Sequence, residues 1–596
     1  MVPDGTSSLG ETQLHFVDSL DEAWEMGRWA SQRRDTPLAF DTESSGLSPE
    51  RDRLRLIQIG DTQAGWAVPM EWSGAALEIL RKYDGELVAH NLPHDFRFLF
   101  RQAGLELPWH KLHDTLLLAS LDDPMRQRGL KPLAKQLVDP LADSGQRALD
   151  DGMKKQGWDW GTVPVDFGPY VWYSALDPVL TAHLWKHLYP RVRESCPRAY
   201  DAEMGANRIC TRMMLKGLRI DRAYVTEAKE KLRTYADEAR TWLILAYDIT
   251  SLLSARQIAK ALTANGEPPT GFTPTGLPQV NKEFLLRVKD YGSTQAAREI
   301  AEQVLGARHA EKLISAYLEN FLARADSDDV VHCQIWQAQA VTGRMSCTEP
   351  ALQTLSRDDR YIRGSFVPRD DHVFISCDYD QVEARLCAHY AEDEGLIRAF
   401  ANADAGGPDF FAGIASQIFG REITKKDQER QLTKNVVYGA CYGAGVEKMA
   451  QTAGVPVATM RPVKEAFDRN YPGVKRFSYK AIAMARSADE LDGRPAVRSG
   501  LGRYLPVERG KEYVSVNRII QAEAAEVLKL VMLDLEAAGL GPSMCLPIHD
   551  EILFEIPKDE AEDARHLIEE TMTVRDRYRV PLTCGAQVLP ERWQKG

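Results

Sequence analysis

Short apolar runs alternate with helical stretches over the first third of the chain. The runs LAF at 38–40 and LRLIQIG at 54–60 are rich in the residues that form buried strands. Longer segments with helical spacing lie between such runs, for example GELVAHNLPHDFRFLFRQAG at 85–104. This alternation predicts an α/β domain, which we expect to end near residue 195, at the turn-forming sequence SCPRAY.

The pattern changes after this domain. Residues 200–325 are mostly helical and charged, and the Pro- and Gly-rich stretch at 266–278 predicts a loop between helices. Three strand-like segments, at 330–341, 372–380 and 547–556, then flank a helical block that runs from about 391 to 490. If strands on both sides of this block share one sheet, the block is an insertion.

Length and composition limit the class of protein. The chain has 596 residues, which is too many for one core and suggests about three or four domains. Apolar residues make up 44% and charged residues 27%, and we find neither a signal peptide nor an 18-residue apolar run. The nine cysteines stand singly, without a CxxC pair, which is typical of reduced thiols. We therefore expect a cytoplasmic protein without a membrane partner; the net charge of −12 decides little.

Acidic residues mark one candidate site in the first third. Asp41 ends an apolar run and Glu43 follows two positions later, so both side chains leave the same face of the expected strand. Two further pairs, each four residues apart on an expected helix, are Asn91 with Asp95 and Tyr173 with Asp177. Four converging carboxylates would repel one another unless divalent cations neutralise them, and oxygen ligands suit Mg²⁺ or Mn²⁺. Taken singly, each acid is better explained as a solvated residue at the end of a strand or helix; only together do they indicate a site.

The order of these motifs resembles that of the DEDD-type 3′→5′ exonucleases in their tyrosine subclass. The resemblance implies a ribonuclease H-like exonuclease domain in which Asp41, Glu43, Asp95 and Asp177 hold two metal ions. Tyr173 is then expected to help orient the attacking water.

A second group of acids lies in the last third. The strand-like run HVFIS leads to Asp378, and the sequence CLPIHDEILFEI places His549, Asp550 and Glu551 between two apolar runs. Burying two adjacent carboxylates in a strand would cost several kcal/mol. We therefore expect a hairpin whose turn is His-Asp-Glu, with Asp378 and Asp550 facing each other across a pair of divalent cations.

Four side chains form a stripe on one expected helix. Arg430, Lys434, Tyr438 and Tyr442 recur every four residues, so two cations precede two rings on the same face. Arginine and lysine suit a triphosphate, and the rings suit a base and its sugar. Gly439 costs about 1 kcal/mol in a helix, which a ligand close to the backbone would explain. An amphipathic helix with a solvated basic end is the alternative.

Residues 332–596 closely resemble the family A DNA polymerases, the bacterial DNA polymerase I family. The motifs that carry the resemblance occur in the family's order: TGRMSCTEPALQTL (342–355), DYDQVEAR (378–385), RQLTKNVVYGACYG (430–443), NRIIQAEAAEVLK (517–529) and HDE (549–551). The segments MLKGLRID and SARQIAKAL also resemble the family's thumb. The resemblance implies an α/β multidomain fold, an exonuclease domain followed by a right-hand polymerase: exonuclease 1–195, thumb 196–330, palm 331–390 with 510–596, and fingers 391–509.

The resemblance also implies roles for single residues. Asp378 and Asp550 are expected to bind two Mg²⁺ ions, for which Mn²⁺ can substitute, with the Tyr379 carbonyl as a further ligand. Glu551 is expected to be a secondary acid, although a structural role stays open. The expected nucleotide-binding residues are Gln381, Glu383, Arg430, Lys434, Tyr438 and Tyr442; Lys434 would also donate a proton to pyrophosphate and Glu383 would exclude a 2′-hydroxyl. The expected primer–template contacts are Arg344, Arg503, Asn517, Gln521 and His549.

Some positions depart from the family pattern. Asp380 stands where Ser is common, and Phe411 stands where many members have a His that touches the phosphates. Tyr438 is Phe in some members. Asp41 lies only about 40 residues from the start of the chain, so we expect no preceding 5′-nuclease domain. This short architecture is most like that of a phage replicative enzyme; a bacterial or organellar enzyme that lacks the 5′ domain is the alternative.

We therefore expect a template-directed DNA polymerase that extends primer 3′ ends with dNTPs and proofreads in a separate site. Its partners would be primer–template DNA and dNTPs; a helicase, primase or processivity factor stays open, and we expect a monomer in the host cytoplasm or nucleoid. One rival is a single-subunit RNA polymerase, which Glu383 disfavours. Another is a nuclease whose carboxy-terminal half only binds nucleic acid, which the presence of Asp378, Lys434 and Asp550 disfavours.

Overall fold

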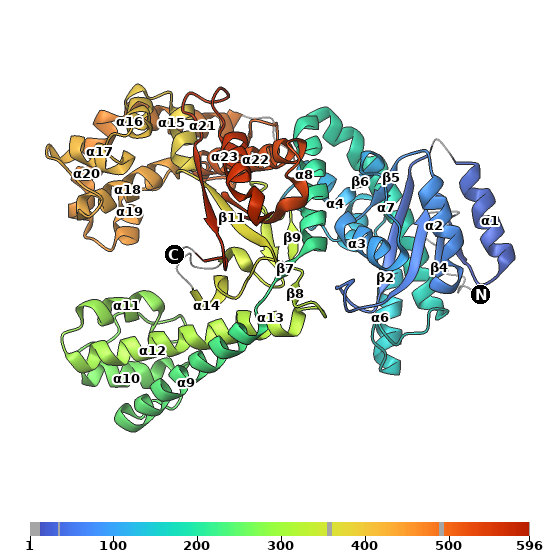
Figure 1. The fold of residues 1–596 in the computed structure, drawn as a ribbon, viewed down its shortest axis with the longest axis horizontal. Coiled ribbons are helices and arrows are strands. Elements are labelled where there is room, and N and C mark those ends of the chain that lie inside the picture. Colours follow the sequence, from blue (N-terminus) through green and yellow to red (C-terminus); the bar gives the residue numbers. More distant parts are fainter. Residues whose placement is uncertain (1–11, 34–35, 355–359, 488–493, 595–596) are drawn as a thin grey trace.

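The computed structural model describes residues 12–33, 36–354, 360–487 and 494–594 of the chain. An α/β domain lies at one end of the molecule (Figure 1). At the other end, two groups of helices extend from a central region on the same side of it, α16–α20 above and α9–α12 below (Figure 1). Among the described residues, no helix has the length and apolar character needed to span a membrane.

The amino-terminal domain is built on a six-stranded mixed sheet. Its strands lie in the order β1 (Gln13–Phe16), β4 (Ala64–Pro69), β3 (Leu54–Gly60), β2 (Leu38–Ser44), β5 (Leu87–Ala89) and β6 (Leu112–Asp114). The β2–β3 and β3–β4 pairs are antiparallel, and the other pairs are parallel. Its helices are α1 (Leu20–Ser31), α2 (Ser73–Lys82), α3 (Leu92–Ala103), α4 (Thr115–Asp122), α5 (Leu130–Leu137), α6 (Ser144–Gln156) and α7 (Gly168–Ser195). The α/β prediction is confirmed, and the long helix α7 packs on β2, β3 and β4.

A helical module follows. Helix α8 (Pro197–Lys216) leaves the first domain, and α9 (Arg222–Tyr247), α10 (Ala255–Ala264), α11 (Lys282–Tyr291), α12 (Gln295–Leu313) and α13 (Glu319–Arg324) come next. Apolar residues of α9–α12 form a small core of their own. The stretch 266–278 lies between α10 and α11, as its Pro and Gly content predicts.

The central region contains a four-stranded antiparallel sheet. Its order is β14 (Met544–Ile548), β15 (Glu551–Pro557), β11 (His372–Tyr379) and β16 (Cys584–Leu589), with α22 (Val514–Ala537) and α23 (Ala561–Met572) beside it. Strands before and after the helical block therefore share one sheet, and the block is an insertion.

Of the two strand-like segments before the block, only the second joins this sheet. The segment 330–341 forms the short strands β8 (Val330–Val331) and β9 (Gln334–Trp336), which pair with β7 (Leu218–Arg219) and β10 (Ser346–Thr348). Beyond Trp336 this segment pairs with no strand among the described residues. The carbonyls of Gln337 and Gln339 instead accept hydrogen bonds from the side chains of Lys529 and Arg128.

The inserted block contains mostly helices. It comprises α15 (Val382–Ala391), α16 (Glu394–Asp404), α17 (Phe410–Phe419), α18 (Gln428–Cys441), α19 (Val446–Ala453), α20 (Val457–Asn470), α21 (Pro472–Ser487) and the hairpin of β12 (Ala496–Arg498) with β13 (Tyr504–Pro506). One hydrophobic core runs from α8 through the sheet into these helices and includes Trp593 near the end of the chain.

Substitution of Trp593 tests how much this residue contributes to the stability of the core. Its side chain is 1% exposed, its ring centroid lies 5.7 Å from that of Phe366, and the Arg363 guanidinium lies 4.5 Å from its ring. Removing a buried tryptophan costs about 3–5 kcal/mol. We expect Trp593→Ala to lower the thermal unfolding midpoint of the carboxy-terminal region, whereas Trp24→Ala, at a residue 69% exposed, leaves it unchanged. Equal midpoints for the two variants would contradict this packing.

Candidate active sites

The strand pairing of the central sheet brings Asp378 and Asp550 to the same edge. Asp378 lies near the end of β11, opposite the first residue of β15, and Asp550 lies in the tight turn between β14 and β15. The Tyr379 amide donates a hydrogen bond of 3.2 Å to the Asp550 carbonyl, which ties the turn to β11. Both carboxylates are half-buried. The predicted hairpin is confirmed, and its turn lies beside the end of a neighbouring strand.

Glu551 differs from its expected place. It does not belong to the turn but begins β15, and it is 1% exposed. Its carboxylate accepts a hydrogen bond of 2.5 Å from the Ser376 hydroxyl and lies 3.5 Å from the Arg363 guanidinium. These two partners satisfy the buried charge, so the geometry favours a structural role for Glu551. His549, by contrast, is exposed and has a positive φ of 56°, which the tight turn requires.

A cavity of about 380 Å³ lies next to this edge of the sheet. Glu383 at its wall accepts a hydrogen bond from the Tyr442 hydroxyl and forms an ion pair with Arg344. Gln381 caps α15 in the left-handed conformation, with φ 54°. The other predicted residues that line the cavity are Tyr379, Tyr438, His549 and Asp550. With Arg344, and with Ala524, Ala525 and Leu528 of α22, the lining includes residues from all five motifs.

The predicted stripe follows α18, with Tyr442 at its carboxyl cap. Arg430 makes two contacts with Asp409, of 2.6 and 3.1 Å, and this partner raises the pKa of Arg430. Phe411, where a histidine is common, is buried against the stripe: its ring centroid lies 5.6 Å from the Arg430 guanidinium carbon and 5.9 Å from the Lys434 ammonium. The apolar ring of Phe411 therefore lies near both cations of the stripe.

The glycine at position 439 of α18 is explained by packing and not by the expected ligand. A Cβ at this position would lie 2.6 Å from the Cγ of Met449 on α19. The Met449 side chain thus occupies the space that a Cβ would need, which explains a glycine here without a ligand.

The expected DNA-contacting residues differ in exposure. Asn517 and Gln521 are half-buried and stand four positions apart on α22, and Arg344 is also half-buried. Arg503 is 1% exposed, pairs with Glu203 and lies 3.7 Å from Glu526. Its guanidinium is enclosed in the protein interior, which argues against the predicted direct contact with DNA.

The amino-terminal acids converge as predicted. Oxygen atoms of Asp41, Glu43 and Asp177 all lie within 4.8 Å of one another. Asp95, at the start of α3, accepts a hydrogen bond of 2.6 Å from the hydroxyl of Thr42, the residue between Asp41 and Glu43. Burial and the neighbouring carboxylates raise the pKa of Glu43 and Asp95 well above their ordinary values, and burial raises the pKa of Asp41. Such a cluster of oxygen ligands fits divalent cations such as Mg²⁺ or Mn²⁺.

Tyr173 and an unforeseen lysine complete this site. Lys131 of α5 forms an ion pair with Asp177, and its ammonium lies 4.2 Å from the centroid of the Tyr173 ring. Burial lowers the pKa of Lys131 to about 7, although Asp41 and Glu43 oppose the shift. Burial also raises the pKa of Tyr173. In the sequence GLKPLAKQL, Lys131 is indistinguishable from a solvated helix residue, so only the fold identifies it.

Comparisons with known proteins agree with this geometry. The family model described as DNA polymerase family A matches residues 222–595, and the model described as 3′-5′ exonuclease matches residues 16–193. The DNA polymerases of Mycobacterium phages D29 and L5 are each 30% identical to the chain, over 89% and 90% of it respectively and over 90% of each relative. The DNA polymerase I of Chloroflexus aurantiacus is 28% identical over 96% of this chain and 63% of its own length.

A solved structure has a similar fold. It is described as the POL domain of Pol1 from M. smegmatis in complex with DNA primer-template and dNTP, and it matches 97% of this chain with a TM-score of 0.78 at 22% identity. The family models cover both halves of the chain. The chain therefore belongs to DNA polymerase family A and carries a 3′-5′ exonuclease domain ahead of the polymerase domain.

Proposed function

We propose that Asp378 and Asp550, with the Tyr379 carbonyl, hold two Mg²⁺ ions that serve nucleotide addition to a primer 3′ end. When bound, such ions favour deprotonation of the attacking hydroxyl and neutralise charge on the phosphates. The observation that carries the proposal is the pairing of β11 with β15, which sets the two acids at one edge of the sheet beside a cavity. Glu551 would keep the hairpin in register through Ser376 and Arg363.

Residues of the cavity, together with two cations of α18 that do not line it, would then bind the incoming dNTP. Arg430 and Lys434 would hold the triphosphate, and Lys434 would donate a proton to the leaving pyrophosphate. Arg430 must first exchange Asp409 for phosphate oxygens, a change that a closing motion of α18 would provide. Glu383, fixed between Arg344 and Tyr442, would exclude a 2′-hydroxyl because the sugar would meet an enclosed carboxylate. Gln381, Tyr438 and Tyr442 would complete the nucleotide site.

We propose primer–template DNA as the macromolecular substrate. Four side chains would contact it from the hairpin turn, α22 and the β9–β10 connection: His549, Asn517, Gln521 and Arg344. Contacts to the DNA backbone and minor groove suit an enzyme that must accept every sequence. Arg503 is not part of this set because of its burial.

The amino-terminal site would remove mispaired primer ends. Asp41, Glu43, Asp95 and Asp177 would hold two Mg²⁺ ions, and Tyr173 would orient the water that attacks the terminal phosphodiester. Lys131 would have to leave Asp177 as a metal ion binds there, since both neutralise the same carboxylate.

We infer a replicative enzyme of a phage, working as a monomer in the host cytoplasm, with the exonuclease at 1–195, thumb at 196–330, palm at 331–390 and 510–596, and fingers at 391–509. The similarity to two phage DNA polymerases over most of both chains supports this role.

Two variants separate the activities. We expect Asp550→Asn to reduce extension of a labelled primer by dNTPs and Mg²⁺ about 1,000-fold or more, because it removes a metal ligand, while digestion of single-stranded DNA is kept. Asp41→Ala/Glu43→Ala should abolish digestion and keep extension. Extension that prefers rNTPs, or digestion that persists in the second variant, would contradict the assignments.

The raised pKa of Glu43 predicts a pH-dependent stability. Burial and Asp41 raise this pKa well above 4.5, so the folded, metal-free domain loses stability as the pH rises from about that value through the raised pKa. In EDTA at pH 8, Glu43→Gln should therefore raise the melting temperature of the exonuclease domain by about 2–4 °C, and the gain should shrink toward pH 5.

Metal provides the control for this experiment. Mg²⁺ or Mn²⁺ should raise the melting temperature of the wild type more than that of Glu43→Gln, because the variant has lost a ligand. A variant that is less stable than the wild type in EDTA, or that gains equally from metal, would overturn the proposed crowding of charge.

A further inference from the structure

The turn between β9 and β10 is held by charged side chains from distant parts of the chain. Lys529 of α22 donates hydrogen bonds to the carbonyls of Gln337 (2.9 Å) and Gly343 (2.6 Å). Arg128 of the exonuclease domain bonds to the carbonyls of Ala338 and Gln339, the latter at 2.6 Å. Four carbonyls of one short turn thus accept hydrogen bonds from two cations. The conformation of the turn depends on elements that are remote in sequence.

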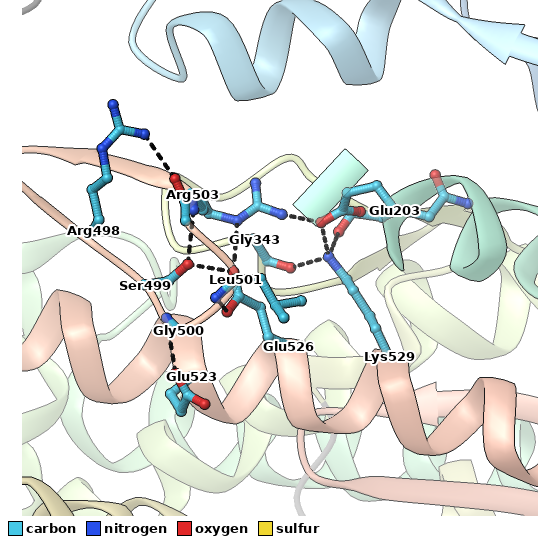
Figure 2. Close-up of polar contacts among 12 residues, drawn as sticks. Glu203, Gly343, Arg498, Ser499, Gly500, Leu501, Arg503, Glu523, Glu526 and Lys529 are labelled. Carbon is cyan, nitrogen blue, oxygen red and sulfur yellow. Dashed lines mark hydrogen bonds and ion pairs between the residues drawn. The ribbon is translucent and has the colours of Figure 1, made fainter. Parts of the chain in front are cut away.

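Lys529 is fully buried, and its charge is neutralised by Glu203 of α8, which is 1% exposed. The carboxylate and the two carbonyls use the three donors of the ammonium group. Figure 2 shows the contacts with Glu203 and Gly343. Breaking a buried pair by removing one partner is costly, whereas the intact pair contributes little net stability. The arrangement is therefore better explained by the position that it imposes on the turn than by stability alone.

Arg503 supports the turn from the other side. A Cβ on Gly343 would lie 2.7 Å from the Arg503 guanidinium carbon, and Gly343 has a φ of +72°. The same guanidinium pairs with Glu203 and lies 3.7 Å from Glu526 (Figure 2). The loop that carries Arg503 is fixed in turn, because Glu526 accepts hydrogen bonds from the Ser499 hydroxyl (2.5 Å) and the Leu501 amide (3.0 Å). Gly343 is thus in close contact with a guanidinium that the protein interior immobilises.

The residue after Gly343 is Arg344, whose guanidinium pairs with Glu383 in the nucleotide cavity. We propose that Glu203, Arg503 and Lys529 form a loop clamp that positions Arg344, and through it Glu383, for nucleotide binding. This inference rests on the proposed function of that cavity. The three residues are positioning residues, because none of them lines the cavity. Helix α8, which leaves the exonuclease domain, thereby supplies the Glu203 carboxylate that helps to position residues of the polymerase site.

The main test removes the buried pair without leaving one charge alone. In Glu203→Gln/Lys529→Met the KM for dNTP in primer extension should rise about tenfold or more, with a smaller change in kcat and unchanged digestion of single-stranded DNA. The matched control is Arg369→Met/Glu555→Gln, which removes another ion pair of the palm. Glu555 lies on β15 opposite Phe374, which is four positions along β11 from Asp378. The control should lower the melting temperature to a similar extent and leave the KM unchanged.

A second comparison distinguishes positioning from general loosening. If the clamp acts through Arg344, adding Lys529→Met to Arg344→Ala should change kcat/KM by less than about twofold relative to Arg344→Ala alone. Independent effects would multiply, as they do for residues that are not coupled. Multiplied losses, or a KM for the clamp variant equal to that of the control, would overturn the proposal.

Two further variants distinguish a failure of folding, and a failure of the proposed function of Arg344, from a failure of the clamp. Should the clamp variants fail to fold, Gly343→Ala displaces the turn against Arg503 with every charge retained, and it should show the same rise in KM. A wild-type KM in Gly343→Ala would refute the clamp. If Arg344→Ala itself keeps wild-type kcat/KM, the proposed function of Arg344 is wrong, whereas an impaired Arg344→Ala with an unimpaired clamp variant refutes only the clamp.

Discussion

The structure has to hold carboxylates close together although they repel one another. The amino-terminal site does so with Asp41 and Glu43 on β2, and the central sheet fixes Asp378 in a similar way near the end of β11. A second element then brings the partner acid, α7 with Asp177 in one case and the β14–β15 turn with Asp550 in the other. The folding free energy of the sheets is thus used to keep charges crowded, and bound cations would relieve the crowding.

Much of this arrangement can be predicted from local pattern. The alternation of Asp41 and Glu43 along a strand, the hairpin around His549 and Asp550, and the inserted helical block all follow from periodicity and turn-forming residues. The first two features depend on residues that are near in sequence, whereas the insertion also needs β11 to pair with the distant strand β15. The position of Glu551, however, depends on the register of the sheet. Glu551 is the first residue of β15 and lies opposite Asp378, so it is not part of the turn.

The features that were missed depend on partners far away in the chain. Lys131 becomes part of the exonuclease site only because α5 packs beside α7, and the glycine at 439 is required by Met449 on the next helix. Arg503 carries the positive charge expected of a DNA contact, but its guanidinium lies between Glu203 and Glu526. No local sequence pattern reveals these two partners. In each case tertiary packing determines what the side chain touches.

The two active sites therefore belong to one connected structure, in which α8 passes from the exonuclease domain to the polymerase and pairs with α22. The central claim is that the chain holds two separate pairs of catalytic metal ions. Anomalous scattering from crystals grown with Mn²⁺, primer–template DNA and a non-hydrolysable dNTP analogue tests it most directly. We expect two peaks among Asp41, Glu43, Asp95 and Asp177, and two more between Asp378 and Asp550. Peaks at other residues, or none beside Asp378 and Asp550, would contradict the account.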